Sequence, residues 1–252
     1  MTYCVAVKLQ GSLIFVSDSR TNAGVDQVNT YGKLYTWGID GERQVALLSA
    51  GNLATTQAVA QRLRREMDDE ASETSLLSLQ RMDEVADYVG RVSREEQSRH
   101  ADGGQVAGFN PEATFILGGQ IKGQSSELYL IYPQGNHIRP SDTSPFLQIG
   151  EVKYGKPILD RIIRPDTPLE DAVRCALVSM DSTMRSNATV GPPIELLIYA
   201  NDTLRLESYL RLEQDDPYLA ELRQSWNQNL LNAFRALPMV GMERLEPPPQ
   251  RT

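Results

Sequence analysis

The chain has 252 residues, of which 40% are hydrophobic and 23% are charged, so we expect a globular protein with a sizeable core. The formal net charge of −8 argues against a protein that binds nucleic acid through a positive surface. The two cysteines and two histidines are scattered, which argues against a zinc site or a disulfide framework, and we expect neither a metal nor another cofactor.

The N-terminal segment alternates between apolar and polar side chains and is interrupted by Lys8, unlike a secretory signal. No other stretch has the apolar length of a membrane span. We therefore expect a cytoplasmic protein that does not bind a membrane.

The chain is predicted to open with a β-hairpin. Residues 3–9 alternate as a half-buried strand does, residues 10–12 suit a turn, and residues 13–17 suit a returning strand. A strand that begins at the chain end would hold that end in a sheet.

Further strands and helices follow in chain order. Residues 44–51 predict a buried strand that ends at Gly51, and Asn52 is a suitable N-cap for a helix that follows. The apolar side chains of that helix recur on one face, namely Leu53, Thr56, Ala60, Leu63 and Met67. A second helix is predicted from its stripe, which is Leu79, Met82, Ala86 and Val89. The glycine-rich residues 100–111 predict a loop.

The second half predicts two strands between residues 113 and 133, a helix, a strand over 194–200 and a last helix at about 215–236. Thr167 and Glu170 fit a capping box for the first of these helices, with Pro168 at its first position. The stripe of that helix is Leu169, Val173, Ala176, Met180 and Met184. The proline-rich residues 245–252 predict a flexible tail. We expect one α+β domain over residues 1–252, with antiparallel sheets covered by helices.

Thr2 is a candidate nucleophile. Removal of Met1 would place a free α-amino group, with an ordinary pKa of about 7.7–8.0, beside the Thr2 hydroxyl, where it can act as a general base. Such an enzyme also needs a cation, a carboxylate that holds the cation, and backbone N–H groups that bind an oxyanion.

Three residues could supply these parts. Asp18 ends the returning strand of the hairpin, and Gly51 precedes a helix N-terminus, where N–H groups favour negative charge. Lys33 is separated by many residues from the nearest other lysine, Lys8. Each has an ordinary alternative: a surface turn for Asp18, a solvated charge for Lys33 and a helix-entry glycine for Gly51. The combination favours catalysis.

The pattern of these residues resembles that of the proteasome β-type subunits, which are N-terminal nucleophile hydrolases. Asp18 lies sixteen residues after Thr2, and the run DSRTNAG (18–24) is similar to the DSRATAG-like run of those subunits. SAGNLA (49–54) is similar to their AGGxAD-like junction, whereas Lys33 lies one residue early. TYCVAVKL, SDSRTNAGVD, LLSAGNLATTQAV and SMDSTMRSN resemble the bacterial ancestral β-subunit branch, Anbu.

The resemblance implies a four-layer αββα sandwich and a threonine peptidase. In this interpretation Thr2 attacks a peptide carbonyl, Lys33 paired with Asp18 favours the alkoxide, and the Gly51 N–H holds the oxyanion. The positions of Thr21, Asn22 and Ser49 line the substrate cleft in β-subunits, and the small Ser49 would leave a roomy pocket. The resemblance also implies homo-oligomeric rings or open spirals that act on peptides or unfolded proteins.

Two supporting positions depart from the β-subunit pattern. Glu151 stands near the position of a serine and Asn187 near that of an aspartate. Glu151 either bonds the terminal amine or is a loop carboxylate, and Asn187 is either a replacement support or the end of a helix.

Two other functions remain open. The departures are compatible with a scaffold subunit that has little activity of its own, and the same nucleophile could serve an amidase that acts on a small amide. The sequence contains no ATPase motif, so a regulatory ATPase would be a separate chain.

Overall fold

The computed structural model describes residues 1–22, 28–69, 72, 74–102 and 110–241, and only the backbone of Asn22, Val28 and Asp102. The predicted loop over 103–109 and the predicted tail over 245–252 lie outside these residues. Residues Met1–Gln214 form one compact unit, and a second begins at Asp215. The second unit contains α5 (Pro217–Arg235), close to the bounds predicted for the last helix.

Two five-stranded antiparallel sheets form the centre of the first unit. The first sheet contains, in spatial order, β10 (Phe146–Gly150), β1 (Tyr3–Lys8), β2 (Ser12–Asp18), β11 (Ile194–Ala200) and β12 (Ser208–Leu212). The second contains β5 (Leu34–Ile39), β6 (Arg43–Gly51), β7 (Ala113–Ile121), β8 (Glu127–Ile131) and β9 (His137–Ile138). A short pair, β3 (Arg20–Asn22) and β4 (Val28–Thr30), follows the hairpin.

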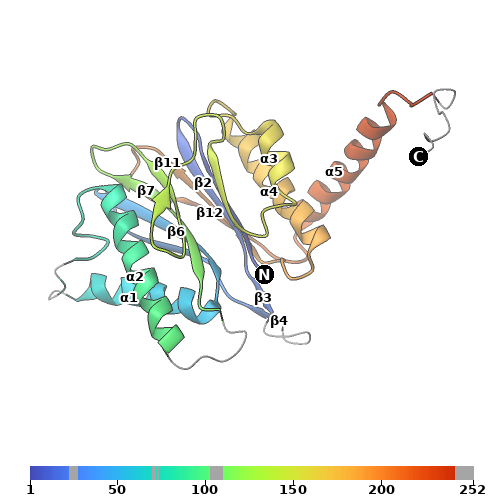
Figure 1. Cartoon of the computed structure of the whole chain (residues 1–252). Helices are drawn as coiled ribbons and strands as arrows, with labels where there is room; N and C mark the ends of the chain where they lie inside the picture. The colour runs from blue at the N-terminus through green and yellow to red at the C-terminus, as the bar shows by residue number, and fades with distance from the viewer. Residues whose placement is uncertain (23–27, 70–71, 73, 103–109, 242–252) are drawn as a thin grey trace, which may run out of the picture. The chain divides into compact units, whose positions relative to one another are not determined.

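Helices cover the outer faces of both sheets (Figure 1). The helices α1 (Leu53–Asp68) and α2 (Met82–Asp102) pack against the second sheet. The helix α4 (Leu169–Ser186) packs against β1 and β2 of the first sheet, with α3 (Lys156–Ile162) beside it. The predicted α+β fold, an αββα sandwich, is therefore confirmed.

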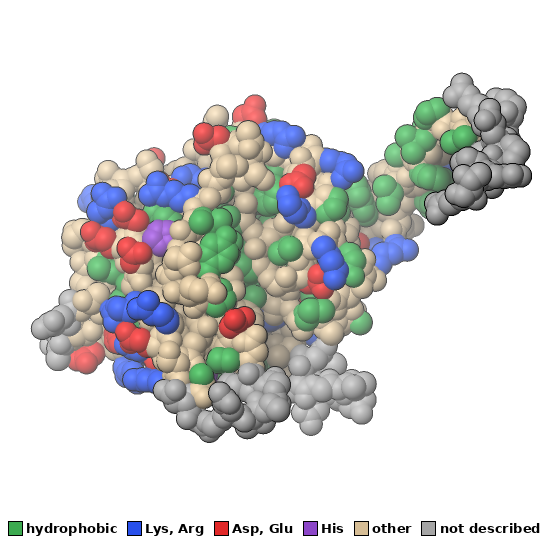
Figure 2. Space-filling view, in the orientation of Figure 1, with side chains coloured by type: hydrophobic (Ala, Val, Ile, Leu, Met, Phe, Trp, Pro, Cys, Tyr) green, Lys and Arg blue, Asp and Glu red, His purple; other side chains and the backbone are tan. Residues whose placement is uncertain are grey.

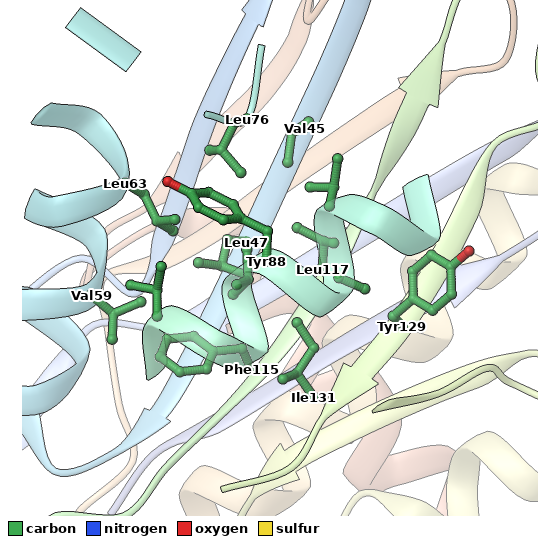
Figure 3. Packing of buried hydrophobic residues seen from close by; sticks show 14 of the residues in the cluster. Val45, Leu47, Val59, Leu63, Leu76, Tyr88, Phe115, Leu117, Tyr129 and Ile131 are labelled. Atoms are coloured by element: carbon green, nitrogen blue, oxygen red, sulfur yellow. The ribbon is translucent and has the colours of Figure 1, made fainter. Parts of the chain in front are cut away.

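Two apolar clusters among the described residues occupy two of the layers of the sandwich. In the outer layer, Leu47 and Leu117 of the second sheet face Val59 and Leu63 of α1, and Tyr88 of α2 closes the cluster (Figure 3). The inner layer lies between the two sheets and includes Phe15 from β2 and Leu48 from β6. Apolar side chains recur with the period of the strands and helices, which brings them together in these clusters.

Several predicted details are confirmed. The hairpin of β1 and β2 pairs Cys4 with Ser17, and the strands β6, β7, β8 and β11 lie where the sequence placed them. The Asn52 side chain caps α1 by accepting a hydrogen bond from the Thr55 N–H at 3.2 Å.

Other details are wrong. Thr167 does not cap α4, whose N-cap is Pro168, because its hydroxyl instead accepts a hydrogen bond from the Arg164 N–H and donates one to the Ile162 carbonyl. Leu169 is 40% exposed, and the buried face of α4 contains Ala172 and Cys175.

The bounds of α2 also differ from the prediction. Leu79 lies before the helix, after a turn at residues 76–78, and its carbonyl accepts a hydrogen bond from Arg43 at 2.6 Å. Residues 100–102, which we placed in a loop, continue the helix to Asp102. The elements β5, β10, β12 and α3 were not predicted, because they are short and their apolar periodicity is weak.

Candidate active site

The start of β1 is held by strands on both sides. On one side, the Tyr3 N–H donates to Asp18 Oδ1 at 3.0 Å. On the other, the Glu151 N–H donates to the Thr2 carbonyl at 2.7 Å, and Gly150 pairs with Tyr3. A Cβ on Gly150 would lie 1.9 Å from the Thr2 carbonyl oxygen, so only glycine permits this approach. The backbone around Thr2 is therefore fixed at the end of the sandwich, beside β3 and β4 (Figure 1).

The Tyr3 side chain anchors the same strand to the helix layer. Its hydroxyl is hydrogen-bonded to Ser179 Oγ of α4 at 3.2 Å and accepts a hydrogen bond from Gln148 Nε2 at 2.6 Å. Burial raises the pKa of Tyr3, so this side chain stays a neutral phenol. Tyr3 therefore has a structural role, whereas Thr2 lines a cleft.

Asp18 and Lys33 form a buried ion pair. Lys33 Nζ donates to Asp18 Oδ1 at 2.7 Å and to the Arg20 carbonyl at 2.7 Å. Asp18 Oδ2 accepts from the Gly191 N–H at 3.2 Å. Burial raises the pKa of the Asp18 carboxyl, and the Lys33 ammonium and the two backbone N–H groups oppose that shift. Because an ammonium has three donors, one N–H of Lys33 remains for a third partner.

Thr2 and Lys33 open into one cleft of about 450 Å³. Its lining consists of Met1, Thr2, Thr21, Lys33, Ser49, Ala50, Gly51, Leu53, Thr56 and Gly150. Five of the sequence-predicted residues therefore line the cleft together, and Asp18 lies behind Lys33.

Gly51 joins the last strand position of β6 to the N-terminal end of α1. Its φ is +114°, in the region that favours glycine, and a Cβ there would lie 2.3 Å from the Glu112 carbonyl oxygen. The structure therefore requires glycine at this point in the cleft wall.

Ser49 lies at the floor of the cleft and is 2% exposed. Its N–H donates to the Lys33 carbonyl at 3.0 Å, and its side chain is hydrogen-bonded to Tyr35. Burial raises the pKa of Tyr35, and that hydrogen bond opposes the shift. Tyr35 thus occupies space beside the small Ser49 side chain. Thr21 is half-buried in β3, where the Asn22 backbone pairs with Val28.

Glu151 and Asn187 lie together. Asn187 Nδ2 donates to Glu151 Oε2 at 3.0 Å, and Lys153 Nζ is 3.3 Å from Glu151 Oε1. Asn187 also forms the C-cap of α4, which fits its interpretation as the end of a helix, and its role as a support of the nucleophile stays a prediction.

The terminal amine lies in the field of this site. Burial and the Lys33 ammonium lower the pKa of the Met1 amino group, whereas Asp18 and Glu151 oppose the shift. This amine belongs to Met1, which must be removed before the α-amino group of Thr2 is free to act as a base.

Sequence reasoning missed four contributors: Gly150, Gly191, Tyr35 and the Arg20 carbonyl. Each reaches the site through a strand pairing or turn between distant segments, and no local pattern marks it. Among the described residues, no helix is long and apolar enough to cross a membrane. Within the same residues, no three His, Cys, Asp or Glu side chains gather as a metal site requires.

The family model described as "Proteasome subunit" matches residues 2–199. A solved structure of Anbu from Yersinia bercovieri is 43% identical, with 95% of this chain and 99% of that chain covered and a TM-score of 0.89. The "Helical Assembly of the Anbu Complex from Pseudomonas aeruginosa" is 45% identical, with 96% and 100% covered and a TM-score of 0.90. Anbu from Hyphomicrobium sp. strain MC1 is 44% identical, with 94% and 98% covered and a TM-score of 0.86. No curated protein matched the sequence.

Proposed function

The chain belongs to the proteasome subunit family and to its Anbu branch, and from that premise we propose that it is an N-terminal threonine peptidase that hydrolyses peptide bonds after removal of Met1. The observation that carries the proposal is the shared cleft, into which Thr2, Lys33 and Gly51 open with Asp18 buried behind Lys33.

The proposed reaction is acyl transfer. Thr2 Oγ1 attacks the carbonyl carbon of a peptide, and the free α-amino group of Thr2 takes the hydroxyl proton and returns it to the leaving amine. Lys33 favours the alkoxide through its charge, and Asp18 keeps the ammonium in place. The Gly51 N–H binds the oxyanion. Water then hydrolyses the ester on Thr2.

The substrate lies along the cleft. Thr21 and Asn22 belong to β3, which borders the cleft, and their backbone would pair with an extended peptide. Ser49 and Leu53 would face the side chain before the scissile bond. Peptides and unfolded proteins fit such a cleft, because an extended chain is needed to reach its floor.

We also propose that the protein works in the cytoplasm as a homo-oligomer, either a ring or an open spiral. A relative is described as a helical assembly. The second unit exposes a set of large apolar side chains (Figure 2), which are Leu230, Leu231, Phe234, Leu237, Met239 and Val240. Such a set is typical of a surface that a partner covers. Both cysteines are free, as in a reducing compartment.

The test is hydrolysis of fluorogenic peptides by the oligomer and by its Thr2→Ala variant. We expect the variant to lose all hydrolysis and to keep its elution volume and unfolding midpoint. Thr203→Ala, an exposed turn residue, is the matched control and should keep full activity. Normal turnover by Thr2→Ala would contradict the assignment of the nucleophile.

A second candidate is a scaffold subunit with little activity of its own. The departures from the β-subunit pattern at Glu151 and Asn187 favour it, because these two side chains are hydrogen-bonded to each other where β-subunits have a serine and an aspartate that support the nucleophile. An amidase for a small amide is a third candidate. Hydrolysis of small amides but not peptides would support the amidase, and retention of Met1 in the purified protein would support the scaffold.

A further inference from the structure

A second carboxylate is buried behind the Asp18–Lys33 pair. Glu195 is the second residue of β11 and is 7% exposed. It pairs with Ser17 of β2, and the neighbouring pair joins Ile194 to Asp18. Its side chain lies on the same face of the strand as Leu197, which packs between the two sheets. Glu195 therefore points into the space between the sheets at the end that holds the active site.

The partners of Glu195 are hydroxyl groups. Ser19 Oγ donates to its Oε2 at 3.3 Å, and the Tyr209 hydroxyl donates to its Oε1 at 2.9 Å. Arg211, which is opposite Glu195 in the β11–β12 register, forms its ion pair with Glu213 at 2.7 Å instead. Among the described residues, no cation forms an ion pair with Glu195. A buried carboxylate without a direct counterion is costly, so its position calls for a use beyond packing.

Glu195 lies close to the backbone that leads to Lys33. A Cβ on Gly32 would lie 3.4 Å from Glu195 Oε2 and 3.9 Å from Oε1, so the carboxylate sits against the residue before Lys33. At these distances a Cβ would make ordinary van der Waals contact with the carboxylate.

Glu195 also holds the segment that binds the Lys33 ammonium. Ser19, which donates to Glu195, lies between Asp18 and Arg20, the two residues that accept hydrogen bonds from Lys33. The Ser19 carbonyl accepts from the Tyr31 N–H at 2.9 Å, which ties this segment to the chain that leads to Lys33. Glu195 therefore connects the segment from Asp18 to Arg20 with the chain that leads to Lys33.

We propose that Glu195 is a positioning residue that fixes Lys33 against Asp18 and supplies a second negative charge behind its ammonium. This inference rests on the proposed threonine peptidase function. A buried ammonium is stabilised by nearby negative charge, and a rigid backbone before Lys33 keeps the free N–H directed at the cleft. In support, the charge of Glu195 contributes to the raised pKa of both Tyr35 and Cys4, after the larger effect of burial. The charge of Glu195 therefore acts on Tyr35, which is hydrogen-bonded to the cleft residue Ser49.

The kinetic test compares Glu195→Gln, Glu195→Ala and Tyr209→Phe with the wild type. Because Glu195 does not line the cleft, we expect KM to stay within about twofold while kcat falls by about 10² in Glu195→Ala, as misplacement of a catalytic group does. Glu195→Gln keeps the shape and should recover part of that loss. Glu127→Gln is the matched control, because Glu127 is a partly buried carboxylate paired with Lys8 at 2.9 Å outside the site.

A crystal structure of Glu195→Gln gives a second measurement that needs no activity. We expect Lys33 Nζ to leave the 2.7 Å contact with Asp18 Oδ1 or to lose its bond to the Arg20 carbonyl. If the wild type hydrolyses nothing, the proposed function fails and this structure still decides the role of Glu195. An unchanged kcat, or an unmoved Lys33, in folded Glu195→Gln overturns the inference.

Discussion

The outer apolar layer and the active-site end of the first unit both contain buried side chains, but these side chains have opposite chemistry. The outer layer, between the second sheet and α1 and α2, consists of apolar and aromatic side chains. At the active-site end, the buried side chains include Ser17, Asp18, Lys33, Ser49 and Glu195. The outer layer stabilises the fold through burial of apolar area. The active-site end stabilises it less, because it holds buried charges in fixed positions.

The difference shows which buried residues the fold itself needs. Burial of a charge is unfavourable unless hydrogen bonds and opposite charges offset it, and the site provides them for Lys33 through Asp18 and the Arg20 carbonyl. A fold that needed only stability would place apolar side chains there. Substitutions in the outer layer should therefore change stability alone, and substitutions in the site should change chemistry, with or without a change in stability.

Lys33→Met should have the largest combined effect on stability and activity. It removes the cation that pairs with the buried Asp18 and that favours the alkoxide of Thr2. Asp18 would remain buried without a counterion, and loss of one partner of a buried pair costs about 3–5 kcal/mol in the free energy of unfolding. Hydrolysis should fall by at least about 10²-fold. Urea unfolding and peptide assays measure the two effects.

A double variant separates the two roles of this pair. Asp18→Asn combined with Lys33→Met removes both charges, so it should recover much of the stability and none of the activity. Lys156→Met, at the exposed Lys156–Asp160 pair, should change neither quantity appreciably. Equal stability of Lys33→Met and wild type would show that the pair does not stabilise the fold.

The next variant, Phe115→Ala, should lower the free energy of unfolding without lowering kcat. Phe115→Ala in the outer layer should cost about 3–5 kcal/mol in the free energy of unfolding, because Phe115 is fully buried and leaves a cavity. The kcat of the remaining folded protein should equal that of the wild type. A reduced kcat at a temperature where the variant is fully folded would break the separation between the two regions.

Gly51→Ala should give an intermediate effect. The φ of +114° and the approach to Glu112 together predict a cost of about 1–3 kcal/mol, and displacement of the Gly51 N–H should reduce kcat. Gly41→Ala is the control, since Gly41 has a φ of +78° and no atom within 4 Å of an added Cβ. Gly41→Ala tests the effect of a positive φ without a steric clash of the added Cβ, and it should leave kcat unchanged.

Ser17→Ala should have the smallest effect. The buried Ser17 Oγ has no hydrogen-bond partner among the described protein atoms, so its removal should change the free energy of unfolding by less than about 1 kcal/mol or increase it. Ser93→Ala is the matched control, because Ser93 Oγ is equally buried and accepts from Gln97 Nε2 at 2.9 Å. Chemical denaturation should show Ser93→Ala to be the more costly of the two.

Local patterns predicted the parts of the fold that local forces determine. The hairpin of β1 and β2 and the Asn52 cap of α1 follow from alternation and capping chemistry within a few residues. The capping box at Thr167 failed because the Thr167 hydroxyl forms a turn with Arg164, which the sequence pattern does not distinguish from a cap.

The site residues divide in the same way, into those that the sequence pattern indicates and those that only the pairing of distant segments brings to the site. Thr2, Asp18, Lys33 and Gly51 could be proposed because a family resemblance linked their spacing. Tyr35, Gly150, Gly191 and Glu195 could not, because they reach the site through the register of distant strands. A single sequence carries no signal for that register.

The most direct test of Thr2 as nucleophile is the intact mass of the purified protein before and after treatment with a peptide epoxyketone, which requires both a hydroxyl and a free α-amino group. We predict a mass that lacks Met1 and gains one inhibitor per chain, with no gain in Thr2→Ala. A protein that keeps Met1, or that lacks Met1 and gains no adduct, would contradict the account.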